Sequence, residues 1–95
     1  MRREKIEIRK IWAHGSLDPE DPVGLDEPYP PIIVAEADED GEYELIDGYH
    51  RVAAAKYDGR RRIWAIIVSP EEYSRLESMR EDEWIEWVQA MAEEA

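Results

Sequence analysis

The sequence predicts a small α+β domain with a mixed sheet, one helix after a central turn and two helices at the C-terminal end. Strand-like apolar runs at 32–35 and 63–68 flank a strand, turn and helix pattern at 43–57, and two helix-start signals follow. A chain of 95 residues is long enough for one hydrophobic core. We therefore expect a single domain over 1–95, with its C-terminal helices at about 70–93.

The first strand is expected at 5–12. Ile6 and Ile8 fall on one face of this segment, whereas Ile11 falls on the other. Such a change of phase is typical of a β-bulge, which we place near Arg9 and Lys10. The following connection, 13–31, contains five prolines, so a long helix is not expected there. His14, at its start, is interpreted as an exposed residue.

Two further strands, 32–35 and 43–46, are separated by Asp38-Glu39-Asp40-Gly41, which predicts a hairpin. The carboxylates of this turn could indicate a calcium loop, but no glutamate closes a twelve-residue loop at the required position. A solvated hairpin tip is the preferred interpretation. The continuously apolar segment 63–68, which includes Trp64, predicts a strand buried on both faces.

The C-terminal part contains two helix-start signals. Ser69-Pro70-Glu71-Glu72 combines an N-cap serine, an N1 proline and a capping-box glutamate, and Ser78-Met79-Arg80-Glu81 repeats the capping-box pattern. Trp84, Trp87, Val88 and Met91 then recur at helical spacing. This stripe predicts a core-facing helix, and its tryptophans leave open a protein-partner surface.

The chain is organised around the segment 43–56. Asp47-Gly48 is a turn dipeptide, and the helix that follows is expected to run from Tyr49 to about Tyr57 and to stop at Asp58-Gly59. The N-terminus of a helix carries unpaired N–H groups and a partial positive charge, so it favours an anion such as phosphate. His50 and Arg51 add donors there, and Gly48 lets the backbone approach a ligand closely.

This turn, with Tyr29-Pro30-Pro31-Ile32-Ile33-Val34 before it and Ile63-Trp64-Ala65-Ile66-Ile67-Val68 after it, resembles the ParB/sulfiredoxin superfamily. It is most similar to the short ParB N-terminal-like domains, often labelled ParB-like nuclease domains, and the resemblance covers about 28–68. Relatives usually have a helix in the region that corresponds to 13–31. The prolines here depart from that pattern.

The resemblance implies different chemistry in different branches of the superfamily. Sulfiredoxins carry a reactive cysteine at the position of Tyr49, and this chain has no cysteine, so sulfiredoxin activity is excluded. ParB proteins hold a nucleoside triphosphate at a related turn and add a helix-turn-helix domain. Kinase-like members share the Asp-Gly-x-His-Arg form most closely.

By that resemblance, Asp47, Gly48, Tyr49, His50 and Arg51 are the nucleotide- or phosphate-binding residues, and ATP, ADP or CTP with Mg²⁺ is the implied cofactor. His50 and Arg51 would contact phosphates, and Asp47 would orient the turn or help to hold a metal. Phosphoryl transfer or nucleotide hydrolysis would also require a carboxylate. Several could serve, among them Glu36 and Glu44, and nothing in the sequence selects one. The catalytic residues are therefore unknown. No protein metal site is predicted, and nuclease activity is the least favoured function.

Three alternatives remain beside this prediction. The site could be degenerate, leaving a non-catalytic interaction or regulatory module that binds a protein through the Trp84 and Trp87 helix. Asp47 before glycine is also common in turns for purely structural reasons. His50 and Arg51 could equally be tied to strand ends or to acidic neighbours.

Charge and hydropathy limit the partners. The net charge of −12 argues against autonomous DNA binding, although Arg51, Lys56, Arg60, Arg61 and Arg62 fall in one short segment. A second group of cations, Arg2, Arg3, Lys5, Arg9 and Lys10, is interpreted as a solvated strand face. The longest apolar run is too short to cross a bilayer, so a cytoplasmic protein without membrane contact is expected.

Overall fold

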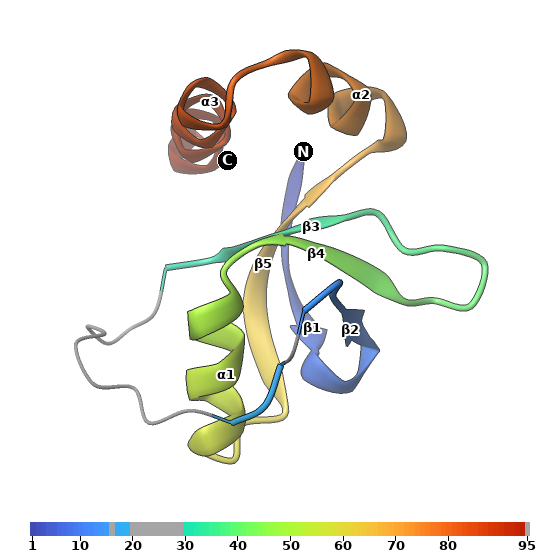
Figure 1. The fold of residues 1–95 in the computed structure, drawn as a ribbon, viewed down its shortest axis with the longest axis vertical. Helices are drawn as coiled ribbons and strands as arrows, with labels where there is room; N and C mark the ends of the chain where they lie inside the picture. Colours follow the sequence, from blue (N-terminus) through green and yellow to red (C-terminus); the bar gives the residue numbers. More distant parts are fainter. Residues whose placement is uncertain (16, 20–29, 95) are drawn as a thin grey trace.

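A five-stranded mixed sheet forms the centre of the protein in the computed structural model, which describes residues 1–15, 17–19 and 30–94 (Figure 1). The strand order is β1-β5-β3-β4-β2. The β1–β5 and β3–β4 pairs are antiparallel, whereas β3–β5 and β2–β4 are parallel. The strands are β1 (Arg2–Glu7), β2 (Ile11–Trp12), β3 (Ile32–Ala35), β4 (Tyr43–Asp47) and β5 (Arg62–Val68). The predicted α+β class and mixed sheet are confirmed, and β3 and β4 form the hairpin that we predicted for 32–35 and 43–46.

Helices cover both faces of this sheet (Figure 1). Helix α1 (Tyr49–Tyr57) packs on one face, and α2 (Pro70–Ser78) and α3 (Glu81–Glu94) lie over the other. The helix after the central turn and the two C-terminal helices are therefore confirmed. Most of the connection 13–31 lies outside the described residues. None of the described helices is both long and apolar enough to span a membrane.

Strand β5 links the two cores because its side chains alternate between the faces. Ile63, Ala65 and Ile67 join the cluster beneath α1, whereas Ile66 and Val68 join the cluster beneath α2 and α3. The prediction of burial on both faces is right for these residues and wrong for Trp64, whose side chain is 43 % exposed. Trp64 shares a face with Ile66 and Val68 but is not part of their cluster.

The N-terminal segment differs from the single bulged strand that we predicted. A short 3₁₀ turn, η1 (Ile8–Lys10), separates β1 from β2, which lie at opposite edges of the sheet. Residues three apart lie on the same side of a 3₁₀ turn. Ile8 and Ile11 consequently enter the same core cluster, which explains the change of phase in the sequence.

The helix ends match the predictions with one exception. Ser69 Oγ accepts from the Glu72 amide at 3.2 Å, and Glu72 Oε1 accepts from the Ser69 amide at 3.0 Å, so the first capping box is formed. The second capping box is wrong. Ser78 is the last residue of α2, and its hydroxyl donates to the Arg75 carbonyl at 2.8 Å instead of capping α3.

The tryptophans of α3 belong to the second core. Trp84 and Trp87 are partly buried and pack against the cluster formed by Ile33, Ile66, Val68, Leu76 and Val88. Val88 itself is fully buried. The core interpretation of the stripe therefore holds for the part of α3 whose side chains are described.

An ion pair joins the start of the chain to α2. The Met1 ammonium lies 3.0 Å from Glu72 Oε2. Burial acts to raise the pKa of the Glu72 carboxyl, but the hydrogen bonds with Ser69 and the ammonium together outweigh it, so its pKa lies below the ordinary value. A carboxylate with a lowered pKa stabilises the fold above its unfolded pKa, and this contribution is lost as the pH falls through the folded pKa.

We expect Glu72→Gln to lower the free energy of unfolding by about 1 kcal/mol at pH 7 in protein with a free Met1 amine, because glutamine keeps the cap but loses the charge. The difference from wild type should shrink as the pH falls through the Glu72 pKa. Urea unfolding between pH 3 and 7 measures it. Glu71→Gln, one residue earlier and exposed, is the control. Equal losses in both variants would contradict the role of the ion pair.

Candidate functional site

The turn between β4 and α1 is built around Gly48. This residue is the N-cap of α1 and has φ +114°, in the left-handed region that favours glycine. A Cβ placed on Gly48 would lie 2.6 Å from Ile32 Cγ2 and 3.1 Å from Arg51 Nη2. The fold itself therefore requires glycine here, independently of any ligand, because β3 passes directly against the turn.

Arg51 holds the turn to the chain that enters β3. Its Nη1 donates to the Pro31 carbonyl at 2.6 Å and to the Pro30 carbonyl at 3.3 Å. Its Nη2 lies 3.0 Å from Asp47 Oδ2, one helical turn earlier in the sequence. The Arg51 side chain is 18 % exposed and that of Asp47 is 37 % exposed. The pair is thus partly buried and still reachable from solvent.

The remaining two predicted residues differ in their surroundings. Tyr49 is partly buried and packs against the core cluster beneath α1, so its side chain contributes to the stability of the fold. His50 is exposed on the first turn of α1. The structure brings Asp47, Gly48 and Arg51 into direct contact and places Tyr49 and His50 beside them on the same turn.

The backbone of this turn has the polarity that we expected. The first intrahelical hydrogen bond of α1 runs from the Val52 amide to the Gly48 carbonyl at 3.0 Å. The amides of Tyr49, His50 and Arg51 precede this bond, at the positive end of the helix dipole. The negative charge of Asp47 would repel an anion at this site, whereas the positive charge of Arg51 would attract it. The site can consequently accept an anion if Arg51 exchanges partners or a cation neutralises Asp47.

The two carboxylates considered for catalysis lie elsewhere. Glu36 follows β3 at the end away from the turn, since Ile33 is the residue paired with Asp47, and it lies 3.4 Å from Arg2. Glu44 accepts from the Tyr73 hydroxyl at 3.0 Å, and burial together with this bond raises the pKa of Tyr73. Both carboxylates are therefore engaged with residues outside the turn. Across the described residues, no group of three or more His, Asp or Glu side chains could hold a metal ion.

Sequence reasoning did not identify three residues that contact the turn. The Pro30 and Pro31 carbonyls bind Arg51, and Ile32 restricts Gly48 to glycine. The one signal for these contacts was the family resemblance, because it included the Pro-Pro-Ile-Ile-Val segment together with the turn. Carbonyl groups leave no mark in a sequence, so only the fold could show this contact.

A strand, a left-handed glycine and a helix that carries arginine on its first turn define this protein as a domain of the ParB-like class. Residues 23–82 match the ParB N-terminal domain, and the chain belongs to this family. A comparison with curated protein sequences finds no significant match. The similar structures include the C-terminally truncated chromosome-partitioning protein ParB from Caulobacter crescentus complexed with CTP-γ-S.

The similarity to that ParB structure is one of fold. The TM-score is 0.57 with 16 % sequence identity, and the alignment covers 81 % of this chain. It covers 49 % of the ParB chain, so this chain spans about half the length of that relative. The resemblance to the ParB superfamily that the sequence predicted is confirmed.

We expect Gly48→Ala to lower the free energy of unfolding by about 3 kcal/mol, because a left-handed backbone and a clash with Ile32 are combined. Gly41→Ala is the matched control. Gly41 also has a positive φ, +79°, but a Cβ on this residue would meet nothing within 4 Å, so about 1 kcal/mol is expected. Chemical denaturation of both variants measures the difference. Equal losses would show that the contact with Ile32 does not matter.

Proposed function

We propose that this ParB-like domain binds a phosphate-bearing small molecule, with a nucleotide such as CTP, ATP or ADP as the ligand, at the Asp47–Arg51 turn. The observation that carries the proposal is the composition of this turn. Gly48 is the left-handed N-cap of α1, and the first amides of α1 and the Arg51 guanidinium follow it on the first turn of the helix. Helix N-termini of this kind bind phosphate groups readily. The fold similarity to a ParB complexed with CTP-γ-S supports the same class of ligand.

Electrostatics give Mg²⁺ a role in this proposal. Asp47 would lie beside the phosphates and repel them, while it already neutralises Arg51 at 3.0 Å. If Mg²⁺ accompanies the nucleotide, Asp47 is the residue of this turn that would help to hold it, and the charge of the ion would offset the repulsion between Asp47 and the phosphates. His50, exposed on the same turn, would add a donor to the phosphate chain. Tighter binding with Mg²⁺ is therefore expected.

Binding is proposed here without a catalytic residue. Glu36 pairs with Arg2 and Glu44 bonds to Tyr73, so neither supplies a base beside the turn. A phosphoryl-transfer reaction would need such a carboxylate to activate the acceptor. The alternative of a protein-interaction module through Trp84 and Trp87 has less support, because both side chains pack against the second core cluster.

We expect calorimetric titration to show saturable binding of at least one of CTP, ATP and ADP, tighter with Mg²⁺ than without it. Arg51→Ala should weaken binding at least tenfold and also lower stability by about 2 kcal/mol, because the bonds to Asp47 and Pro31 are lost. His50→Ala, at an exposed position, should weaken binding about threefold to tenfold, and a melting curve of this variant measures any accompanying change in stability.

Lys56→Ala is the matched control, because Lys56 is a cation at the other end of the same helix. It should bind the nucleotide as wild type does. Absence of saturable binding by the folded wild-type protein across the nucleotides and inorganic phosphate would overturn the proposal. An equal loss in Lys56→Ala and His50→Ala would show a general charge effect and not a site.

A further inference from the structure

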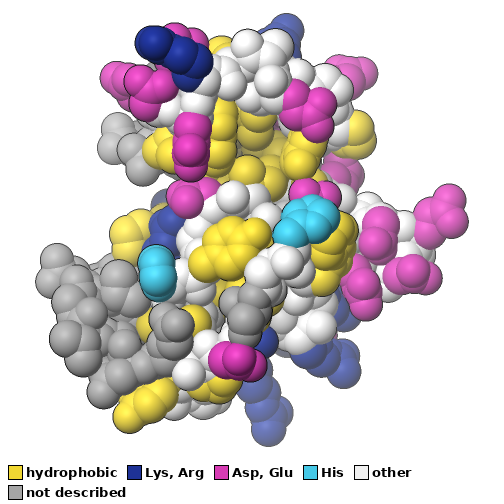
Figure 2. All heavy atoms as spheres, in the orientation of Figure 1, with side chains coloured by type: hydrophobic (Ala, Val, Ile, Leu, Met, Phe, Trp, Pro, Cys, Tyr) yellow, Lys and Arg dark blue, Asp and Glu magenta, His cyan; other side chains and the backbone are white. Residues whose placement is uncertain are grey.

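Charge is strongly segregated along this acidic chain. The segments 1–12 and 51–64 contain ten of the twelve Lys and Arg residues and only three of the 24 Asp and Glu residues, a net charge of +7. The rest of the chain therefore carries −19. Figure 2 shows acidic side chains gathered over the β3–β4 hairpin and around α2 and α3, with basic side chains projecting from the lower edge of the molecule. The net charge of −12 averages over two unlike regions.

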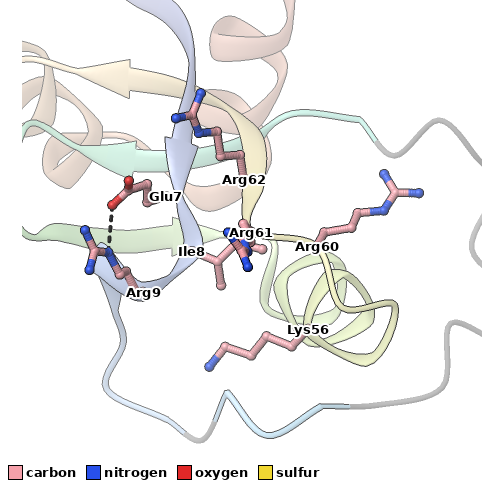
Figure 3. Close-up of a pocket in the computed structure, with 7 residues that line it drawn as sticks. All are labelled: Glu7, Ile8, Arg9, Lys56, Arg60, Arg61 and Arg62. Atoms are coloured by element: carbon pink, nitrogen blue, oxygen red, sulfur yellow. Dashed lines mark hydrogen bonds and ion pairs between the residues drawn. The ribbon is translucent and has the colours of Figure 1, made fainter.

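The positive region includes a pocket where η1, the C-terminal end of α1 and the start of β5 meet. It has a volume of about 760 Å³ and is lined by Glu7, Ile8, Arg9, Lys56, Arg60, Arg61 and Arg62 (Figure 3). Its one carboxylate, Glu7, is occupied by Arg9 at 2.8 Å. Within the described part of the chain, Lys56, Arg61 and Arg62 form no ion pair with a carboxylate. Figure 3 shows Lys56 reaching from α1 toward the η1 side.

A basic strip with one aromatic ring continues from this pocket along the sheet. The β1–β5 register pairs Glu7 with Arg62, Lys5 with Trp64 and Arg3 with Ile66, so these side chains share one face. Arg3 Cζ and Lys5 Nζ lie 5.2 and 5.6 Å from the centre of the Trp64 ring. Trp64 remains 43 % exposed and is not part of the cluster beneath α2 and α3. From Arg3 to Glu7, the strip spans about 13 Å.

We propose that the basic pocket and the Trp64 strip form one binding surface for single-stranded nucleic acid. The phosphates would follow Lys5, Arg62 and Arg61 into the pocket, and a base would stack on Trp64 as Arg3 and Lys5 turn from the ring to the backbone. Cationic tracks with an exposed aromatic ring on a sheet are suited to single strands, whose bases are free to stack. The bases of a duplex are already paired and stacked, so they cannot reach Trp64.

This surface is separate from the proposed nucleotide site. Lys56 lies in the last turn of α1 and Arg60–Arg62 follow the helix, whereas Gly48 and Arg51 lie at its start. The proposal also departs from the expectation that net charge disfavours binding to DNA. The acidic remainder of the chain weakens long-range attraction, so we expect binding that is detectable at low salt and falls steeply as salt is added.

The test is fluorescence anisotropy of a labelled 20-nucleotide oligo(dT) strand and of a strand of the same length made of abasic units. Both strands carry the same phosphates, but only the first can stack. Wild-type protein should prefer oligo(dT) by about fivefold or more, since one stacked base contributes at least that much. Polyglutamate, as an unlabelled competitor, tests for an acidic protein partner instead.

Variants separate the two parts of the surface. Trp64→Leu should abolish the preference for oligo(dT), whereas Trp64→Tyr should keep most of it. Arg61→Gln combined with Arg62→Gln should weaken binding to both strands and reduce the slope of log affinity against log salt by about 1.4. Arg75→Gln, a cation in the acidic region, should change nothing. His50→Ala should also bind the strand normally, which distinguishes this surface from the nucleotide site.

Three outcomes would overturn the proposal. Undetectable binding at 50 mM salt by folded wild-type protein would show that this surface does not bind single-stranded nucleic acid. Equal affinity for the abasic strand and oligo(dT) would reduce it to a general polyanion surface without stacking. Displacement of the strand by polyglutamate at equal charge concentration, together with an unchanged Trp64→Leu variant, would indicate an acidic protein partner. Melting curves of each variant confirm that the fold is intact.

Discussion

The close contact between Gly48 and Ile32 is the constraint on which the rest of this structure depends. It allows β3 to enter the sheet directly against the turn that starts α1, which brings the Pro30 and Pro31 carbonyls within reach of Arg51. Strand β3 then lies between β4 and β5, and β5 carries residues of both cores. A side chain at Gly48 would displace β3, and with it the strand pairs on either side.

The same contact gives Arg51 a structural role beside the ligand-binding role that we propose for it. A guanidinium group offers five donors in a rigid plane, and here Nη1 and Nη2 bind the carbonyls before β3 and the Asp47 carboxylate. Those bonds stabilise the turn in the absence of ligand. They also hold a cation beside the first amides of α1, where a phosphate would be bound. Under the proposed function, fold stability and ligand affinity are therefore coupled at Arg51.

The two ends of α1 consequently have different chemistry. Its N-terminal end combines backbone amides with an Asp47–Arg51 ion pair, and it is the end at which we propose a small phosphate-bearing ligand. At its C-terminal end, several cations surround a pocket that continues into an exposed tryptophan on the sheet. That end suits an extended polyanion. Segregation of charge makes both compatible with a chain whose net charge is −12, because local potential and not net charge determines what each surface attracts.

The sequence by itself determined the α+β class, the hairpin, the limits of α1 and the first capping box, because each depends on neighbouring residues such as Asp58-Gly59 or Ser69-Pro70. The tertiary structure decided the features that depend on distant residues. It placed β1 and β2 at opposite edges of the sheet, where β1 pairs with β5 and β2 pairs with β4, and it brought Ile8 and Ile11 into one core. It left Trp64 exposed, and it joined Arg51 to Pro31 across 20 residues. Local patterns record propensity and spacing, whereas these contacts arise only when separate segments pack together.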